Sequence, residues 1–284
     1  MSAAHQVRLS ARKNAITFTS GLAPTYLQAN LICLPSRYAQ DFRLLCQRNP
    51  VPCPLLAESK SVGKYTELKS WMANIADSAI AANLDIRTDI PKYMVYKDGK
   101  LEKFQCQDLC EEWTEDHVAF LIGCSFSFES ALAAAGLPPR QTVMQRNVPM
   151  YRTNIPLCAA GVFTGGTYVV SMRPYALDRI EEVRNITRPY VATHGEPIAW
   201  GWDAVRQLGI ADIDKPEWGD APLAVDGQRF GLGTEKDVVP VFWGCGVTPQ
   251  EAVMRANLRG TVMAHAPGHM LVMDVKEGEV LDSK

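Results

Sequence analysis

Apolar and polar residues alternate along this 284-residue chain with periods that predict both helices and strands. In SRYAQDFRLLCQRNP the apolar residues recur every three or four positions, which predicts an amphipathic helix that begins at Ser36 and ends at Asn49-Pro50. In KYMVYKDGKLEKFQ two alternating runs flank Asp98-Gly99, a dipeptide favoured in two-residue hairpin turns. We therefore expect a surface β-hairpin at this point of the chain.

A buried strand followed by a Gly-Cys pair and a helix is predicted in HVAFLIGCSFSFESALAAAG. The apolar run 118–122 precedes Gly123-Cys124, Ser127 is in position for a helix N-cap, and Gly136 ends the helix.

The same order of elements is predicted in VVPVFWGCGVTPQEAVMRANL, where Gly244-Cys245-Gly246 follows an apolar strand. Thr248 is expected as the N-cap, Pro249 as the first helical residue and Glu251 as the partner in a capping box. Both helix starts would present unpaired backbone N–H groups, which favour a carboxylate or an oxyanion. Glycines that permit a tight turn and cysteines that fill apolar gaps explain the pattern equally well.

Three further segments carry polar side chains that could bind a small anion. Arg173 ends the β-branched run TYVVSMRP, where an arginine can grip a carboxylate, although a salt bridge to an acidic residue is an equal alternative. Arg152 and Asn154 lie in NVPMYRTNIP, and His194 lies beside a glycine turn after the amphipathic helix ALDRIEEVRNI. Residues 200–236 are rich in Gly, Pro and Asp, which predicts an irregular excursion.

The alternation of strands and helices in the second half predicts an α/β fold, while the early hairpin leaves a mixed α+β fold open. We expect a mixed-sheet core with helices around a central cleft. Residues 1–284 are expected to form a single domain, with two sub-lobes as an open alternative.

Composition and charge restrict the partners. The formal net charge is −2 and no long basic run occurs, so we expect no nucleic acid partner. No apolar run is long enough to span a bilayer, and we expect no membrane partner. The segment MSAAHQVRLSARKN has no apolar signal core, which favours the cytoplasm, but its basic residues leave a mitochondrial location open.

Eight scattered cysteines are typical of a reducing compartment. Cys106 and Cys110 are interpreted as thiols on one helix face, because no second pair at zinc-ribbon spacing occurs.

The segment HAPGHM places His265 and His269 four residues apart. Pro267-Gly268 prevents a continuing helix and predicts a type II turn between two strands. No cofactor is expected, but a divalent metal held by both histidines, with Cys245 or Glu129 as third ligand, stays open as an alternative.

Long blocks of the chain resemble the hydro-lyase family that includes the D-glutamate cyclase domain, and the resemblance runs in order from about Arg8 to Asp274. These blocks are LAPTYLQANLICLP, RNPVPCPLL, LDIRTDIPKY, GCSFSFESAL, RNVPMYRTNIP, VVSMRP, THGEP, VPVFWGCGVTPQ and HAPGHMLVMD. The resemblance implies lyase chemistry on a small amino or carboxylic acid. For D-glutamate cyclase, the amine closes on the side-chain carboxyl group to give 5-oxo-D-proline and water.

Such a reaction needs proton donors and acceptors, donors for an oxyanion, and a cation for the spectator carboxylate. The candidate catalytic residues in the family-like blocks are His265, His269, Cys124 and Cys245. The candidate substrate-binding residues are Arg152, Asn154, Arg173, Glu129 and His194.

The segment HGEPIAWGWDAV departs from the family pattern HGAPVHIGDP, and a change of substrate would follow if residues 196–203 line the pocket. Two other functions remain open. One is a non-catalytic module that binds small carboxylates, and the other is an amide hydrolase that uses a Cys124 or Cys245 thioester. A homo-oligomer is also compatible with the sequence.

Overall fold

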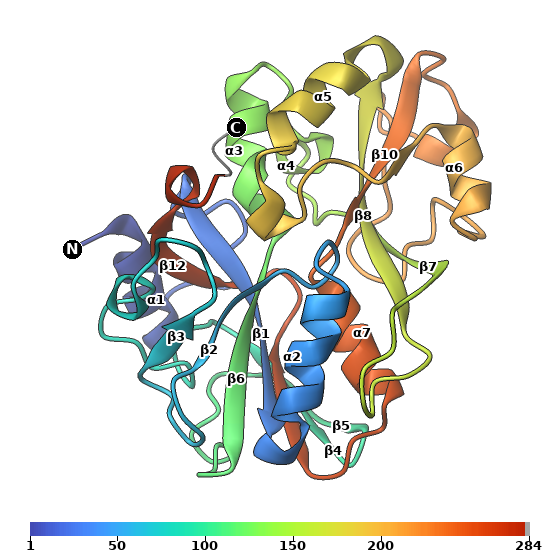
Figure 1. Ribbon diagram of the computed structural model, residues 1–284. Coiled ribbons are helices and arrows are strands. Elements are labelled where there is room, and N and C mark those ends of the chain that lie inside the picture. The colour runs from blue at the N-terminus through green and yellow to red at the C-terminus, as the bar shows by residue number, and fades with distance from the viewer. Residues whose placement is uncertain (282–284) are drawn as a thin grey trace.

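Two antiparallel sheets form the framework of the computed structural model, which describes residues 1–281 (Figure 1). The larger sheet has the order β3-β2-β6-β1-β11-β4-β5, with β12 also paired to β1, and the smaller has the order β7-β8-β10-β9. The strands of the larger sheet are β1 (Tyr26–Pro35), β2 (Leu55–Ser59), β3 (Leu68–Ser70), β4 (Tyr93–Lys97), β5 (Lys100–Cys106), β6 (His117–Gly123), β11 (Thr261–His265) and β12 (Leu271–Lys276). Those of the smaller sheet are β7 (Met150–Pro156), β8 (Thr167–Ala176), β9 (Ala199–Trp200) and β10 (Val238–Gly244).

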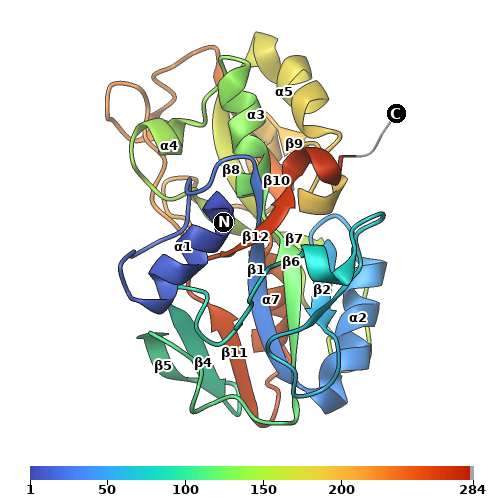
Figure 2. The same cartoon turned by 90° about the vertical axis from the view of Figure 1, so that its left-hand side faces the viewer.

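Helices cover one face of the larger sheet and both faces of the smaller one. The helices are α1 (Ala3–Arg12), α2 (Ala39–Arg48), α3 (Glu129–Ala134), α4 (Arg140–Val143), α5 (Ile180–Thr187), α6 (Trp202–Gln207) and α7 (Val247–Arg255). Helices α2 and α7 pack on the same face of the larger sheet (Figure 1), and apolar residues of the irregular segment 71–92 cover the other face. Helices α3 and α5 pack on one face of the smaller sheet (Figure 2), and α6 packs on the other (Figure 1).

The predicted mixture of helices and strands is confirmed. The paired strands within residues 1–281 are all antiparallel, which corresponds to the α+β alternative. The predicted helix α2 is confirmed, with a 3₁₀ turn at Ser36–Tyr38 before it. The hairpin is also confirmed, because Asp98 and Gly99 have φ of 50° and 76°, as a type I′ turn requires.

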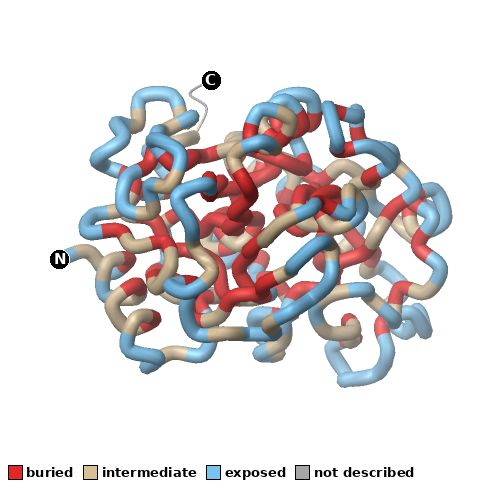
Figure 3. Tube along the Cα trace, turned by 90° about the horizontal axis from the view of Figure 1, so that it is seen from below, coloured by how far each residue is buried: buried red, intermediate tan, exposed pale blue. Residues whose placement is uncertain are grey.

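The two strand–Gly-Cys–helix segments connect the two sheets in opposite directions. One leads from β6 in the larger sheet toward β7 in the smaller, and the other leads from β10 back to β11. The segments meet at their glycines, since a Cβ on Gly246 would lie 1.9 Å from Nδ2 of Asn30 and 3.0 Å from the carbonyl oxygen of Gly123. Glycine is therefore required for the backbones to cross this closely. The buried chain in the middle of the molecule is shown in red in Figure 3.

Both predicted helix caps are wrong. The chain turns as a 3₁₀ helix at Ser125–Phe128, and the Ser127 hydroxyl accepts from the backbone N–H of Gln28 in β1 rather than capping α3. Helix α7 begins at Val247, so Thr248 lies inside it, and its hydroxyl bonds both the N–H and the carbonyl of Val169 in β8. Tertiary hydrogen bonds have displaced local capping in both cases.

Two smaller predictions are also wrong. Cys106 ends β5 and Cys110 lies in a turn, so these thiols do not share a helix face. Strand β8 continues past Arg173-Pro174 to Ala176. Pro174 is tolerated there because its partner in β10 is Pro240, and neither proline has an N–H that could donate to the other strand.

The basic residues near the start of the chain belong to the fold. Arg8 of α1 is fully buried and donates to Oδ2 of Asp274 at 2.7 Å and to the Val272 carbonyl at 2.8 Å. Arg12 pairs with Asp89. Among residues 1–281, none of the helices has both the length and the apolar character needed to cross a bilayer.

Candidate functional site

The HAPGHM segment is the tight turn between β11 and β12. The N–H of His269 donates to the carbonyl of Ala266 at 3.0 Å, and Gly268 has a φ of 82°. Proline followed by a glycine with positive φ identifies a type II turn. The predicted strand–turn–strand is therefore confirmed, and His265 and His269 bracket the turn.

A cavity of about 210 Å³ lies beside this turn, between the larger sheet, α7 and the irregular excursion. It is mainly apolar, with His265 and Gln250 as its most polar side chains. Its lining residues are Ile32, Met94, Tyr96, Phe104, Trp218, Gln250, Val253, Met254, Val262, Ala264, His265 and Pro267. Its volume is below the roughly 300–1,000 Å³ of pockets for drug-sized ligands, and it suits a metabolite the size of an amino acid.

His265 is held in one orientation by the neighbouring strand. Its Nδ1 accepts the N–H of Leu31 in β1 at 3.1 Å, and Nε2 of Gln250 lies 2.9 Å from the same atom. Burial lowers the pKa of His265 to about 4, so the ring is neutral at physiological pH. The Leu31 carbonyl also lies 3.3 Å from Nδ1, but both donors are closer. With Nδ1 as the acceptor, the proton of the neutral ring is on Nε2, which makes His265 a hydrogen-bond donor rather than a base.

His269 has the opposite arrangement. Its Nδ1 lies 2.7 Å from the carbonyl oxygen of Pro267. A carbonyl can only accept, so Nδ1 carries the proton and Nε2 keeps its lone pair. His269 is 8% exposed and is not part of the cavity wall, but a charge on it would lower the pKa of His265, so the rings are electrostatically coupled.

Arg152 of β7 lies at the edge of the cavity. Its guanidinium carbon lies 5.2 Å from the ring centre of Trp218, which lines the cavity. Its Nε donates to Glu251 at 2.8 Å, while Nη1 is 3.8 Å from Glu217. The side chain is 35% exposed, so its outer nitrogens have room for a further carboxylate.

Five of the other predicted residues meet where the two strand–Gly-Cys–helix segments cross and pack together. We call this set the central cluster: Cys124, Glu129, Arg173, His194 and Cys245.

Arg173 is the only cation of the central cluster. It is fully buried and donates to Glu129 through Nε at 2.9 Å and through Nη2 at 2.5 Å. Two of its other donors are directed to the hydroxyls of Ser171 and Ser125, both at 3.1 Å. Four of its five N–H donors are used in this way, so the alternative of a salt bridge to an acidic residue describes Arg173, and the single N–H left on Nη1 cannot grip a substrate carboxylate in a bidentate manner.

The two cysteines of the central cluster are protonated. Burial raises the pKa of Cys124 to about 12 and that of Cys245 to about 11. The expectation that the helix starts stabilise a thiolate is wrong, because the loss of hydration outweighs the backbone N–H groups.

His194 is buried beside the same crossing. It has a φ of 90°, and its Nδ1 bonds the Val51 carbonyl at 2.8 Å, while Nε2 has no partner in the described chain. Burial lowers the pKa of His194 to about 4. Asn154 is remote from both groups of residues, since its amide donates to the Gln207 carbonyl beside α6.

Nowhere in residues 1–281 do three His, Cys, Asp or Glu side chains converge in a way that could hold a metal ion. The ligand set considered for His265 and His269 with Cys245 or Glu129 is therefore not assembled in this structure.

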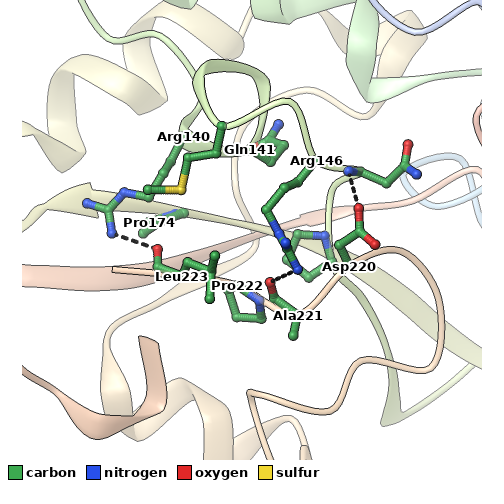
Figure 4. Close-up of a pocket in the computed structure, with 11 residues that line it drawn as sticks. Arg140, Gln141, Arg146, Pro174, Asp220, Ala221, Pro222 and Leu223 are labelled. Carbon is green, nitrogen blue, oxygen red and sulfur yellow. Dashed lines mark hydrogen bonds between the residues drawn. The ribbon is translucent and has the colours of Figure 1, made fainter. Parts of the chain in front are cut away.

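A second hollow, beside α4, contains two arginines but little space (Figure 4). Arg140 donates to the Leu223 carbonyl and Arg146 to the Ala221 carbonyl, so both bind the wall of the hollow itself. Its volume of about 10 Å³ is room for one water molecule at most. The cavity beside His265 is therefore the better substrate site.

Comparison with known proteins decides the family. A model of the D-glutamate cyclase family matches residues 118–274, which is more than half of the chain. The chain belongs to the D-glutamate cyclase family. The matched span includes both crossing segments and the turn that carries His265.

Relatives of this family match over nearly the whole chain. A protein of Schizosaccharomyces pombe named "Putative hydro-lyase" is 47% identical over 90% of this chain and 79% of its own length. A protein of Staphylococcus haemolyticus with the same description is 44% identical over 93% of this chain and 91% of its own. Among solved structures, a nitrogen repressor-like protein from Methanococcus jannaschii is similar at a TM-score of 0.39 and 10% identity, covering 100% of this chain and 99% of its own.

The segment that departs from the family pattern lies away from the cavity. Glu196 pairs with Arg184 and Arg188 on α5, and Trp202 stacks on Phe230 at 5.1 Å. None of residues 196–203 lines the cavity beside His265, so the condition for a changed substrate is not met there.

Sequence reasoning missed four polar or aromatic residues of the cavity in this member of the D-glutamate cyclase family: Tyr96, Phe104, Trp218 and Gln250. Gln250 lies in the first turn of α7, directly after the Gly-Cys-Gly segment, and this position was the signal that could have identified it. Trp218 lies in the irregular excursion, where no periodicity indicates which way a side chain points.

Proposed function

We propose that this protein is a hydro-lyase that converts D-glutamate, or a closely similar amino acid, to 5-oxo-D-proline and water at the cavity beside His265. The observation that carries the proposal is the neutral His265 ring on the cavity wall, held so that Nε2–H is its free donor. The family relationship supports the dehydrating chemistry.

The reaction forms one C–N bond and breaks one C–O bond. The substrate amine must lose a proton before it attacks the side-chain carboxyl carbon, and a carboxyl oxygen must gain protons to leave as water. His269 lies outside the cavity wall but is hydrogen-bonded to Pro267, which lines it, and with Nδ1 directed at the Pro267 carbonyl its Nε2 is the atom suited to accept the proton. Nε2–H of His265 is suited to stabilise the oxyanion and to assist departure of the oxygen.

The second carboxylate of the substrate requires a cation near the apolar cavity. Arg152 is the candidate, because its guanidinium lies over Trp218 and is not fully occupied by Glu251 and Glu217. Arginine suits this role because its planar fork can bind a carboxylate in a bidentate manner. Gln250 contacts the same nitrogen of His265, Nδ1, as Leu31 does and so helps to hold the ring in place.

The test is an assay of purified protein with D-glutamate, L-glutamate and related hydroxy acids, followed by mass spectrometry. Loss of water from D-glutamate by the wild-type protein, and not by His265→Asn, is the expected result. Thermal stabilisation by D-glutamate without product would instead identify a module that only binds small carboxylates.

A further inference from the structure

Another cavity, of about 170 Å³, lies between the loop 19–25 and α3, and it shares no lining residue with the cavity beside His265. Two glutamates line it, Glu129 and Glu277, together with Ser130, Gln28 and the apolar side chains of several neighbours. We call it the Glu277 cavity.

The charge of the Glu277 cavity is not balanced within the described chain. Glu129 is neutralised by Arg173, which donates to it from two nitrogens. Glu277 is only 7% exposed, and its one side-chain hydrogen bond in residues 1–281 comes from the Ser130 hydroxyl at 2.7 Å. A buried carboxylate without a cation is costly and is usually paired.

Gln28 provides an independent indication of a missing donor. It is 4% exposed, and its Nε2 donates to the carbonyls of Thr19 and Leu22, which fixes which amide atom is the oxygen. Its Oε1 is buried without a hydrogen-bond partner in residues 1–281. The Glu277 cavity is therefore lined by an unpartnered acceptor on β1 and, on the 3₁₀ turn after β12, by a carboxyl group that has no cation within the described chain.

The remaining wall distinguishes an organic cation from a bare metal ion. Phe126, Ala133, Pro138 and Pro139 present carbon atoms to the cavity. Hard metal ions require several oxygen ligands, and the described residues do not provide a cluster of three metal-ligating side chains. An ammonium group on a short alkyl chain would satisfy both the acceptors and the apolar wall.

We propose that the Glu277 cavity is a binding site for a small primary amine, whose ammonium group pairs with the carboxylate of Glu277. Burial raises the pKa of Glu277 to about 7, and a bound cation would lower it again.

The loop 19–25, which forms part of the wall of this cavity, also contacts the turn between β11 and β12. At one end of the loop, the N–H of Thr19 donates to the Gly268 carbonyl at 3.0 Å. At the other end, the Thr25 carbonyl accepts from the N–H of Glu277 at 2.9 Å. Ala23 and Thr25 have φ of 48° and 73°, a left-handed conformation that residues other than glycine rarely adopt. Bound amine would stabilise this strained loop.

The experiment is isothermal titration calorimetry with n-butylammonium chloride, with 1-butanol and sodium butyrate as the neutral and anionic probes of similar shape. Wild-type protein should bind only the ammonium ion, and Glu277→Gln should lose at least about tenfold in affinity, since a charged hydrogen bond is removed. Glu279→Gln is the matched control, because Glu279 is exposed and does not line the cavity. It should bind as the wild type does.

Ala133→Leu is a second variant that fills the cavity from an exposed helix position, and it should also abolish binding. Circular dichroism of each variant shows whether it folds. Equal affinity in wild type and Glu277→Gln, equal binding of butanol, or no binding of the ammonium ion would overturn the proposal. So would competition of Mg²⁺ or K⁺ for the site at lower concentration than the amine.

Discussion

The backbone N–H of Leu31 donates a hydrogen bond to Nδ1 of His265 across 3.1 Å. This contact joins β1 to the end of β11 and, with the Gln250 amide beside the same nitrogen, favours the tautomer that carries its proton on Nε2. It separates the roles of the two histidines in HAPGHM, since His265 is a donor and His269 has the free lone pair.

His265→Asn should lower kcat with D-glutamate by about 10²–10⁴-fold, the usual contribution of a positioned proton donor. Asparagine can still accept the Leu31 N–H, so the melting temperature should change little. Steady-state kinetics and a thermal melt measure both quantities. Unchanged kcat in a folded variant would show that the donor is elsewhere.

His269→Ala should abolish turnover because the proposed proton acceptor is lost, again with a small change in melting temperature. Exogenous imidazole should partly restore activity, since the missing ring leaves space for it. His5→Ala, on α1, is the control and should keep full activity. Full turnover by the His269 variant would remove this residue from the mechanism.

Arg152→Ala should abolish or strongly reduce turnover, through a large rise in KM for the dicarboxylic substrate. Arg255 provides the matched control, because it also donates to Glu251, at 2.7 Å, whereas only Arg152 lies over the Trp218 ring that lines the cavity. Each substitution leaves the buried Glu251 paired with the other arginine, so it should cost only about 1 kcal/mol of folding free energy. Equal effects of both substitutions on KM would indicate a general loss of charge rather than binding at Arg152.

Cys124→Ser and Cys245→Ser should each keep most of their activity. Burial raises the pKa of both thiols far above neutral pH, so neither is a ready nucleophile. Turnover by each variant, and by wild-type protein alkylated with iodoacetamide, measures this. A covalent substrate adduct on either cysteine in intact-mass spectra would instead support the thioester alternative.

Glu277 should make stability depend on pH. Its pKa is raised from 4.5 to about 7 by burial, so the folded state binds the extra proton between these values. This contribution is fully present below pH 4.5 and is lost as pH rises through about 7. In urea unfolding, the free energy of unfolding of Glu277→Gln should therefore equal that of the wild type near pH 4.5. At pH 8 it should be larger than that of the wild type by on the order of 3 kcal/mol. A difference that does not vary with pH would show an unshifted carboxyl group.

Local patterns predicted most of the elements. The helix α2, the hairpin at Asp98-Gly99 and the type II turn at Pro267-Gly268 depend on residues close in sequence, and all three are present. The caps at Ser127 and Thr248 failed because their hydroxyls bond distant strands, β1 and β8. Sequence spacing carries no information about such tertiary partners.

The candidate site was predicted only in part. His265 and Arg152 lie at the cavity, but Arg173 and Glu129 neutralise each other in the core. The sequence shows that an arginine ends a strand, and it does not show which acid faces it. Trp218 comes from the irregular excursion, where neither period nor turn signal predicts a direction.

The most direct test of the central claim is mass spectrometry of D-glutamate incubated with wild-type protein and with His265→Asn. The account predicts 5-oxo-D-proline, with loss of one water molecule, from the wild type and almost none from the variant. Equal product from both proteins, or no dehydration of any amino or hydroxy acid by the wild type, would contradict it.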